Sequence, residues 1–316
     1  MRSTLLFTVG AVFGTLVAGC ASQSQSTPDY VPGFDPGPVP DGYTRFLTPT
    51  VRDIQPGDNV QYCQWVAPAS EQAQDVLAFM GKQSPTGHHA VLYATTNTSF
   101  AVGESHICTV ADMIPLSFIG GIGGEGMANT KLPDGLYFRL PAGQGLMVNS
   151  HWLNATDDVV DGQAAIDVKF AATDANRVTA DLFANNGDTF MIPAGGTASS
   201  DTNCVLKSDL NFALVGNHMH TMGSSTYSEL LRTDGTTTML VNDNPWLAEE
   251  QFNPAFKSYT VDVPLAAHAG DTYHNHCEWQ NTTSTDLMFP DEMCVGFGFY
   301  FPGHGQITCD DGDWTN

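Results

Sequence analysis

The most constraining feature of this sequence is a succession of short runs in which apolar and polar residues alternate, separated by Gly, Pro, Asn and Asp. A side-chain period of two is typical of half-buried strands, and frequent turn residues favour antiparallel over parallel pairing. We therefore predict an all-β protein made of antiparallel β-sandwiches. The expected strands are residues 60–66, 90–94, 136–140, 146–153, 165–170, 189–192, 228–232, 239–241, 258–263, 272–279 and 294–301.

Two stretches do not follow this pattern clearly. Residues 70–80 form the one helical candidate, with Ser70 as its cap, although residues 74–80 fit a strand equally well. The glycine-rich residues 120–126 lack the Gly-Lys-Ser/Thr ending of a phosphate loop, so we predict a flexible surface loop there.

Residues 1–20 indicate an export signal, with Arg2 followed by a short apolar stretch. Its end, Leu16-Val17-Ala18-Gly19-Cys20, resembles the bacterial lipobox, in which the cysteine is acylated. A plain cleaved signal or an uncleaved anchor is the alternative. Residues 21–42 are rich in Ser, Gln, Pro and Asp and predict a flexible tether. We expect an exported bacterial lipoprotein, on the outer membrane facing the periplasm or at the cell surface.

Charge and cysteine content narrow the possible partners. With 11 Lys+Arg against 34 Asp+Glu, the formal net charge is −23, which argues against nucleic acid and against electrostatic binding to anionic lipid. Membrane attachment would therefore depend on the acyl group. Lipidation of Cys20 would leave six of the seven cysteines, and an even set in an exported protein predicts three disulfides of open connectivity. These cysteines are Cys63, Cys108, Cys204, Cys277, Cys294 and Cys309.

The most informative motif is His218-Met219-His220, which follows an apolar run at residues 212–215. In an extended backbone, His218 and His220 project from the same face and form a chelating pair. Imidazole suits copper, zinc, iron or nickel, so the pair alone does not select the metal. The alternative is a structural strand histidine beside a surface one.

A second histidine set is more distant in the sequence. His88 and His89 are adjacent, so they would point to opposite faces of a regular strand and could share a metal only if the backbone were irregular. Pro85, Thr86 and Gly87 before them permit such a bend. With His151 they would supply three neutral imidazoles, a copper or zinc site.

A sulfur ligand could complete the first pair. Met293 lies in Asp291-Glu292-Met293-Cys294, and a thioether added to two imidazoles suits copper, especially monovalent copper. Met222 is a local rival, because alternation places it on the same face as the His-x-His pair. The neighbouring Cys294 leads us to prefer Met293.

In this order and at near-even spacing, these motifs resemble the copper type II, ascorbate-dependent monooxygenases, the family of peptidylglycine α-hydroxylating monooxygenase and dopamine β-hydroxylase. The resemblance extends from about residue 60 to 309. It implies two tandem antiparallel β-sandwich (jelly-roll-like) domains, residues 43–174 and 175–316. The second domain would begin within residues 171–179.

The resemblance also implies the site and its cofactors. His88, His89 and His151 would hold an electron-supplying copper, and the catalytic, oxygen-binding copper would lie at His218, His220 and Met293. This means two copper ions per chain, O2, ascorbate or another reductant, and a small-molecule or peptide substrate. The implied disulfides are Cys63 with Cys108, Cys204 with Cys309 and Cys277 with Cys294.

The sequence departs from the family at two places. Amidating members carry an arginine where this chain has Gly216, and polar residues where it has Val295, Gly296 and Phe297 after Cys294. The anchor for the carboxylate of a glycine-extended peptide is therefore not expected, and a less polar substrate is favoured.

We predict a copper monooxygenase that hydroxylates a substrate C–H bond. Two alternatives are a non-catalytic copper-binding or copper-delivering lipoprotein, and an adhesion or carbohydrate-binding sandwich with structural histidines. Substrate, electron donor, oligomeric state and turnover are left open by the sequence.

Some polar residues have open roles. Asn149, Asn217, Asp291 and Glu292 are candidates to orient ligand imidazoles. His274 and His276 form a second His-x-His before Cys277; we interpret it as a strand pair beside a disulfide, and metal binding there as the alternative.

Overall fold

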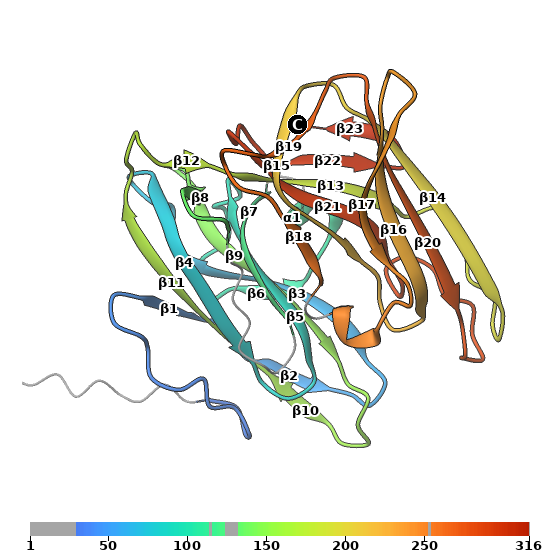
Figure 1. Cartoon of the computed structure of the whole chain (residues 1–316). Coiled ribbons are helices and arrows are strands. Elements are labelled where there is room, and N and C mark those ends of the chain that lie inside the picture. The colour runs from blue at the N-terminus through green and yellow to red at the C-terminus, as the bar shows by residue number, and fades with distance from the viewer. Residues whose placement is uncertain (1–29, 114–115, 124–131, 252–253, 316) are drawn as a thin grey trace, which may run out of the picture.

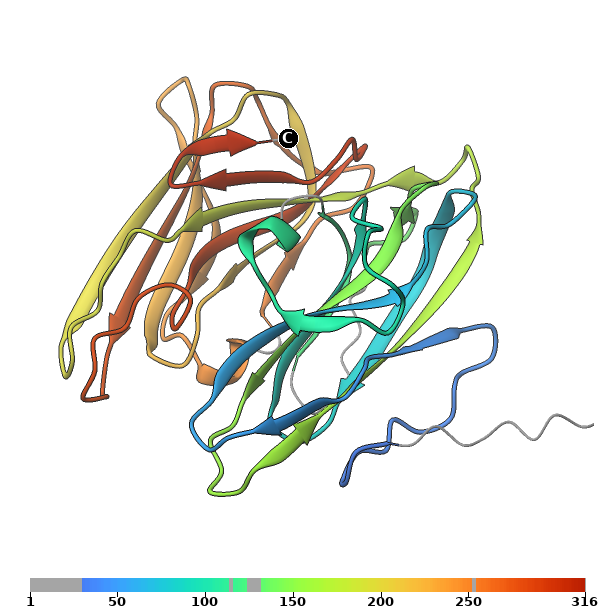
Figure 2. The same ribbon diagram turned by 180° about the vertical axis from the view of Figure 1, so that it is seen from behind.

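The computed structural model describes residues 30–113, 116–123, 132–251 and 254–315. Two pairs of β-sheets lie side by side, with the N-terminal half of the chain in one pair and the C-terminal half in the other (Figures 1 and 2). The expected all-β sandwich architecture is confirmed. The expected signal peptide, Cys20 and residues 21–29 of the expected tether fall outside the described residues. The flexible tether was wrong for the described residues 30–42, because Val31 and Phe34 are buried and pack against Ala165 of β11.

The N-terminal pair consists of two five-stranded sheets, with a two-stranded ribbon at one end. One sheet has the order β1 (Thr44–Leu47), β11 (Ala164–Ala172), β4 (Gln74–Gln83), β8 (Leu136–Leu140), β12 (Val178–Thr179). The other has the order β6 (Ser105–Ile107), β3 (Asn59–Ala67), β9 (Gly145–Leu153), β5 (Gly87–Thr95), β7 (Leu116–Gly123). The ribbon joins β2 (Val51–Ile54) and β10 (Val160–Gly162), and the short helix α1 spans Val110–Met113.

The C-terminal pair consists of a seven-stranded and a four-stranded sheet. The larger has the order β18 (Phe256–Ser258), β15 (Leu210–His218), β21 (Cys294–Phe301), β13 (Asp181–Gly187), β22 (Ile307–Asp310), β23 (Asp313–Thr315), and β19 (Leu265–Ala267) also pairs with β15. The smaller has the order β14 (Thr197–Val205), β20 (Thr272–Gln280), β16 (Gly223–Leu231), β17 (Thr237–Asp243), and a 3₁₀ turn spans Ala248–Gln251.

Pairing is antiparallel apart from β12 with β8 and β13 with β22. Because β12 joins the N-terminal sheets and β13 begins the C-terminal ones, the chain passes between the two pairs at residues 179–181. The boundary expected between residues 174 and 175 stays a prediction.

Aromatic side chains pack between the two pairs of sheets. Phe299 on β21 lies 5.2 Å from Phe118 on β7 and 5.1 Å from Phe138 on β8, between ring centroids. All three belong to the apolar core of the N-terminal pair, which therefore extends across the junction. Burial of these aromatic rings stabilises the interface between the two pairs of sheets.

The structure decides the secondary structure of one ambiguous stretch and shows that two expected strands were wrong. Residues 74–80 lie in strand β4, paired with β11 and β8, so the strand alternative holds and the helix does not. Residues 189–192 contain only an isolated bridge between Ile192 and Leu287. Of residues 258–263, only Ser258 is in a strand; beyond it Val263 N–H donates to Thr260 Oγ1 in a turn.

The glycine-rich stretch is also different from the expected surface loop. Residues up to Gly123 belong to strand β7, which pairs with β5, whereas residues 124–126 lie outside the described part. A Cβ atom at Gly120 would lie 2.6 Å from the Phe79 ring. Glycine there permits close contact between the two facing sheets rather than flexibility.

Candidate metal centre

The adjacent histidines lie at the beginning of strand β5, where the backbone is irregular as the sequence requires. The pairing register between β5 and β9 shifts between Gly87 and His89, and Thr86 has φ of +70°. This bulge brings one ligand atom from each of His88, His89 and His151 to within 4.8 Å of one another. The three residues that the sequence grouped are therefore a compact trio.

A buried glutamine holds the bulge. Gln83 Nε2 donates to the carbonyl oxygens of His89, at 3.1 Å, and His151, at 3.2 Å. A Cβ atom at Gly87 would lie 2.4 Å from the Cβ of Gln83, so only glycine allows this approach. Sequence reasoning missed Gln83, because nothing local distinguishes it from any other strand glutamine.

The His151 ring is oriented by a residue that the sequence also did not identify. Its Nε2 forms a hydrogen bond with Asn59 Oδ1, whereas its buried Nδ1 has no hydrogen-bond partner among the described residues. An amide oxygen accepts, so Nε2 carries the proton and Nδ1 keeps its lone pair. An acceptor that holds the ring N–H away from the ligand nitrogen is typical of metal-bound histidine.

The other pair lies where β15 ends. His218 pairs with Val295 of β21, and His220 follows beyond the strand. His220 Nδ1 donates to the carbonyl oxygen of Asp291 at 3.0 Å, which leaves its buried Nε2 without a partner in the described structure. Met293 is half-buried, in the segment between Asp291 and Val295.

Glu292 fixes the loop that carries His220. Its carboxylate accepts hydrogen bonds from His220 N–H at 3.0 Å, Met222 N–H at 2.6 Å and Trp279 Nε1–H at 3.1 Å. Burial raises the pKa of Glu292 to about 7, against the opposing effect of these donors. Glu292 thus joins the motif around Met293 to the backbone of the His-x-His motif, rather than to an imidazole ring.

The two histidine sets form one continuous cluster. Ring centroids of His88 and His220 lie 5.0 Å apart, those of His151 and His220 6.1 Å, and those of His89 and His218 6.5 Å. Sequence reasoning expected two separate pockets. The histidine-bearing ends of β5, β9 and β15 meet at the junction between the two sheet pairs, where Phe299 also contacts Phe118, so the sets are neighbours.

All five imidazoles are held neutral. Burial, followed by repulsion from neighbouring histidines, lowers the pKa of His88 to about 3 and that of His151 to about 2. The same causes lower the pKa of His89 and His218 well below the usual value. Burial lowers the pKa of His220 despite the opposing effect of Asp291. Neutral imidazole is the form that binds metal ions.

Residues 181–312, including His218, His220 and Met293, match the family model of the copper type II ascorbate-dependent monooxygenase C-terminal domain. The C-terminal part of this chain is therefore similar to that family's C-terminal domain. No curated protein matches the chain. The trio of His88, His89 and His151 precedes the matched region, so its assignment depends on geometry.

Solved structures resemble the chain only weakly. The major capsid protein P2 from bacteriophage PM2 is 9% identical, with a TM-score of 0.30, over 83% of this chain and 99% of that chain. PBCV-1 VP54, fitted into a reconstruction of the virophage Sputnik, is 5% identical, with a TM-score of 0.33, over 88% of this chain and 96% of that chain. Likenesses at these TM-scores do not inform the function.

Copper, the metal of this monooxygenase family, fits the donors present. His151 Nδ1 and His220 Nε2 are buried lone pairs without hydrogen-bond partners among the described residues, which is costly unless a ligand compensates. Neutral nitrogen donors suit copper rather than magnesium or calcium. Met222, the rival sulfur, accepts a hydrogen bond from Thr282 Oγ1 at 3.5 Å, which favours Met293.

The other candidate orienting residues have different partners. Asn149 Nδ2 donates to Cys108 Sγ at 3.0 Å, and Asn217 Nδ2 donates to Asp243 Oδ2 at 3.0 Å. Asp291 contacts the His220 imidazole through its backbone carbonyl oxygen and not through its carboxylate. Neither asparagine contacts an imidazole in these hydrogen bonds.

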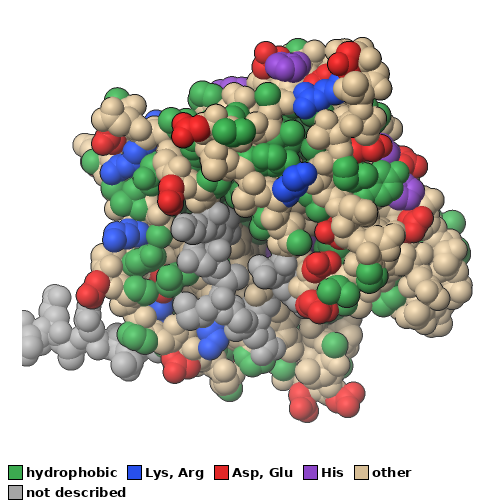
Figure 3. Space-filling view, in the orientation of Figure 1, with side chains coloured by type: hydrophobic (Ala, Val, Ile, Leu, Met, Phe, Trp, Pro, Cys, Tyr) green, Lys and Arg blue, Asp and Glu red, His purple; other side chains and the backbone are tan. Residues whose placement is uncertain are grey.

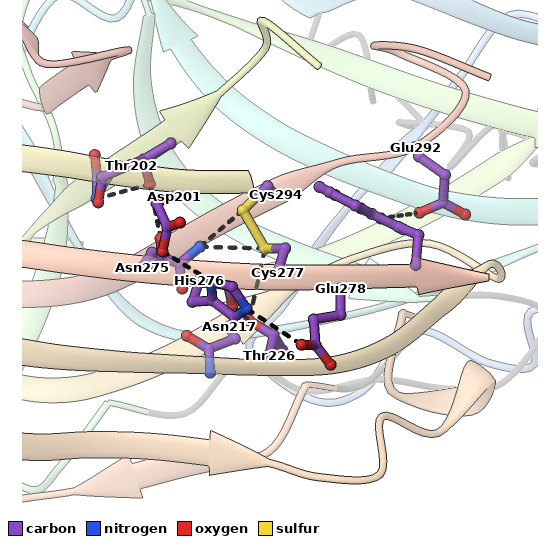
Figure 4. The surroundings of a disulfide bond; sticks show 12 residues. Asp201, Thr202, Asn217, Thr226, Asn275, His276, Cys277, Glu278, Glu292 and Cys294 are labelled. Atoms are coloured by element: carbon purple, nitrogen blue, oxygen red, sulfur yellow. Dashed lines mark hydrogen bonds and ion pairs between the residues drawn. A yellow bond between two sulfur atoms is a disulfide. The ribbon is translucent and has the colours of Figure 1, made fainter. Parts of the chain in front are cut away.

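The structure contains three disulfides, Cys63–Cys108, Cys204–Cys309 and Cys277–Cys294, the same pairs that the resemblance implies. Cys277–Cys294 joins β20 to the first residue of β21, directly after Met293, and the side chain of Asn275 lies against both sulfur atoms (Figure 4). Its position therefore restrains the backbone of the proposed sulfur ligand.

Proposed function

We propose that this chain is a copper-dependent monooxygenase that hydroxylates a substrate C–H bond with O2 and an external reductant. One observation carries the proposal: five neutral histidines from two sheet pairs converge in one cluster. The match of residues 181–312 to the monooxygenase family model supports it. His88, His89 and His151 would hold one copper, and His218, His220 and Met293 the other. Bound copper supplies the one-electron and O2 chemistry.

The chain's own residues position and protect these donors. Asn59 and the Asp291 carbonyl set the tautomers of His151 and His220, and Glu292 restrains the loop of the second set. His88 and His151 are 2% exposed, which excludes bulk water from the cluster and favours an uncharged, soft environment.

The surroundings of Gly216 argue against a carboxylate anchor. A Cβ atom there would lie 3.3 Å from both the Ala255 carbonyl oxygen and the Phe256 ring. Strand β18 therefore occupies the space that an arginine at this position would need. This crowding supports a less polar substrate than a glycine-extended peptide.

We further propose that Cys20 is acylated and attaches the protein to a membrane, with the chain joining the fold at Val31 and Phe34. Among the described residues, no helix has the length and apolar character needed to cross a membrane. Radiolabelled palmitate incorporation by wild type, but not by Cys20→Ser, would test the anchor.

The catalytic proposal is tested on the copper-loaded protein. O2 uptake with ascorbate is measured over a panel of aromatic and aliphatic small molecules, and product is checked for ¹⁸O from ¹⁸O2. We expect uptake and labelled product in wild type and in His268→Gln, an exposed histidine, and neither in His220→Ala. Two bound coppers without product in any assay would favour copper delivery, and no bound copper would favour an adhesion or carbohydrate-binding role.

A further inference from the structure

Residues 30–37, which we call the N-terminal strap, lie against the sheet that contains β1, β11 and β4. Val31 and Phe34 are buried and pack on Ala165 of β11, which is directly opposite Lys82 of β4 in the pairing register. Figure 3 shows apolar and basic side chains together on the flank of the molecule beside the N-terminal chain. Apolar contact therefore holds the strap to the face of the sheet that Ala165 and Lys82 share.

The strap also contacts the end of β4, directly before the turn that leads to the adjacent histidines. Lys82 Nζ donates a hydrogen bond to the carbonyl oxygen of Asp35 at 2.9 Å. A Cβ atom at Gly33 would lie 3.5 Å from Pro85 Cγ, which is an ordinary contact distance. The strap therefore contacts the chain on both sides of Gln83.

A buried glutamine links the strap to the same turn. Gln163 Oε1 accepts a hydrogen bond from Val31 N–H, and Gln163 Nε2 donates one to the Thr48 carbonyl oxygen, both at 3.3 Å. Ser84 N–H donates to the Gln163 carbonyl oxygen at 2.9 Å, and Gln163 N–H donates to Ser84 Oγ at 3.0 Å. The strap and Ser84 thus belong to one hydrogen-bond network.

Ser84 begins the turn that shapes the bulge in β5. Gly87 N–H donates to the Ser84 carbonyl oxygen at 3.1 Å, and Leu153 N–H donates to the Thr86 carbonyl oxygen at 3.0 Å. A bulge leaves one residue without a partner in the ladder, so the sheet alone restrains it less than a regular strand. Contacts outside the ladder are therefore needed to fix this turn.

Gln83, the residue before Ser84, holds the backbone of the histidines themselves. Its Nε2 donates to the carbonyl oxygens of His89 and His151. Lys82 and Gln83 are consecutive strand residues, so their side chains point to opposite faces of the sheet. The strap on one face and the histidines on the other therefore act on neighbouring residues of one strand.

We propose that the N-terminal strap positions the three-histidine copper set, with Phe34 and Lys82 as positioning residues. The inference rests on the proposed function, because it takes His88, His89 and His151 as copper ligands. Ligand side chains must be held within about 0.5 Å of the productive geometry. The strap would meet this requirement by fixing the end of β4 and the turn that follows it.

The test measures copper affinity in the full chain by competition with a calibrated chelator. Phe34→Ala should weaken copper at the three-histidine set about 10-fold, the lower end of the effect of residues that support metal ligands. The set with His218 and His220 should be unaffected. Phe34→Leu should restore most of the affinity, because it keeps an apolar side chain on Ala165.

Phe170→Ala is the matched control, because Phe170 lies at the opposite end of β11, where it pairs with Val76. This variant also loses an aromatic ring from the same sheet but leaves the strap intact. We expect the electron paramagnetic resonance signal of divalent copper at the three-histidine set to change in Phe34→Ala and not in Phe170→Ala. A general loss of stability would not alter the copper spectrum of the folded protein.

Amide hydrogen exchange in the metal-free protein tests the strap separately from copper binding. The N–H groups of Gly87 and Leu153 report on the turn, and we expect both to exchange faster in Phe34→Ala than in wild type or Phe170→Ala. Lys82→Met removes only a hydrogen bond at the surface, so the fold is kept, and it should accelerate the same two amides.

Unchanged copper affinity in Phe34→Ala would overturn the positioning role. Equal changes in Phe34→Ala and Phe170→Ala would also overturn it, because the strap would then act only on the stability of the whole fold. Failure of wild type to bind copper would instead contradict the proposed function. In that case the exchange rates at Gly87 and Leu153 would still show whether the strap fixes the turn.

Discussion

The imidazole of His88, from the N-terminal sheets, lies 5.0 Å from that of His220, from the C-terminal sheets. Copper ions held by these two sets would be neighbours, close enough for their unpaired electrons to interact. This proximity depends on the junction between the sheet pairs, where Phe299 contacts Phe118 and Phe138.

Phe299→Ala should therefore disturb the copper cluster from outside it. Removing a buried phenylalanine costs about 3–5 kcal/mol of unfolding free energy. We expect this loss and, in addition, weaker magnetic coupling in the electron paramagnetic resonance spectrum of the protein loaded with divalent copper. The matched control is Phe183→Ala, since Phe183 is fully buried in the core of the C-terminal pair alone. Equal coupling in both variants would contradict the role of the junction.

The stability of the metal-free protein should fall as the pH is lowered. Burial holds the pKa of His151 at about 2, so His151 stays neutral in the fold while the unfolded chain takes up a proton below its ordinary pKa of 6.5. The unfolded state then binds more protons, and the contribution of His151 is lost progressively from about pH 6.5 downwards. One such histidine contributes about 1.4 kcal/mol per pH unit.

His151→Gln should make this dependence shallower by about that amount. Urea unfolding at pH 7, 6 and 5 measures the slope, and His268→Gln serves as the exposed control. An unchanged slope in His151→Gln would mean that the His151 ring is protonated in the folded metal-free protein.

Much of the fold could be predicted from local alternation. Residues 136–140 and 294–301 coincide with strands β8 and β21, because more and less buried residues alternate along β8 and along the first half of β21. Residues 70–80 could not be decided locally, since their apolar residues fit either period. Pairing of β4 with β11 and β8, which are distant in the sequence, selects the strand.

Part of the candidate site could also be predicted from the sequence, and part could not. The ligand histidines are visible as short motifs, and the bulge at His88 follows from adjacency alone. The contact between His88 and His220 could not be predicted, because it depends on how two sheet pairs meet. Gln83 acts on backbone carbonyls across strands, and such partners leave no local signal.

Asn59 provides a direct test of what sequence reasoning missed. Asn59→Ala removes the acceptor that fixes the His151 ring, and we expect copper affinity at the three-histidine set to fall about 10- to 100-fold. Asn149→Ala is the control, because Asn149 lies in the same strand as His151 but its side chain contacts Cys108 Sγ. Competition with a calibrated copper chelator measures both. A larger effect from Asn149 would restore the original expectation and remove Asn59 from the site.

The disulfides allow stability and copper binding to be separated. Cys204–Cys309 spans 105 residues and Cys277–Cys294 spans 17, so loop entropy predicts losses of about 4.7 and about 3 kcal/mol on removal. Cys204→Ser/Cys309→Ser should therefore lower the urea midpoint more than Cys277→Ser/Cys294→Ser.

The loss of copper should be greater in Cys277→Ser/Cys294→Ser than in Cys204→Ser/Cys309→Ser, because only Cys294 adjoins Met293. We expect the Cys277 and Cys294 pair of substitutions to weaken copper at the methionine set while the three-histidine set keeps its ion, measured by copper content and X-ray absorption for a sulfur ligand. If copper loss instead follows the loss of stability, the disulfide acts on the fold as a whole and not on the ligand.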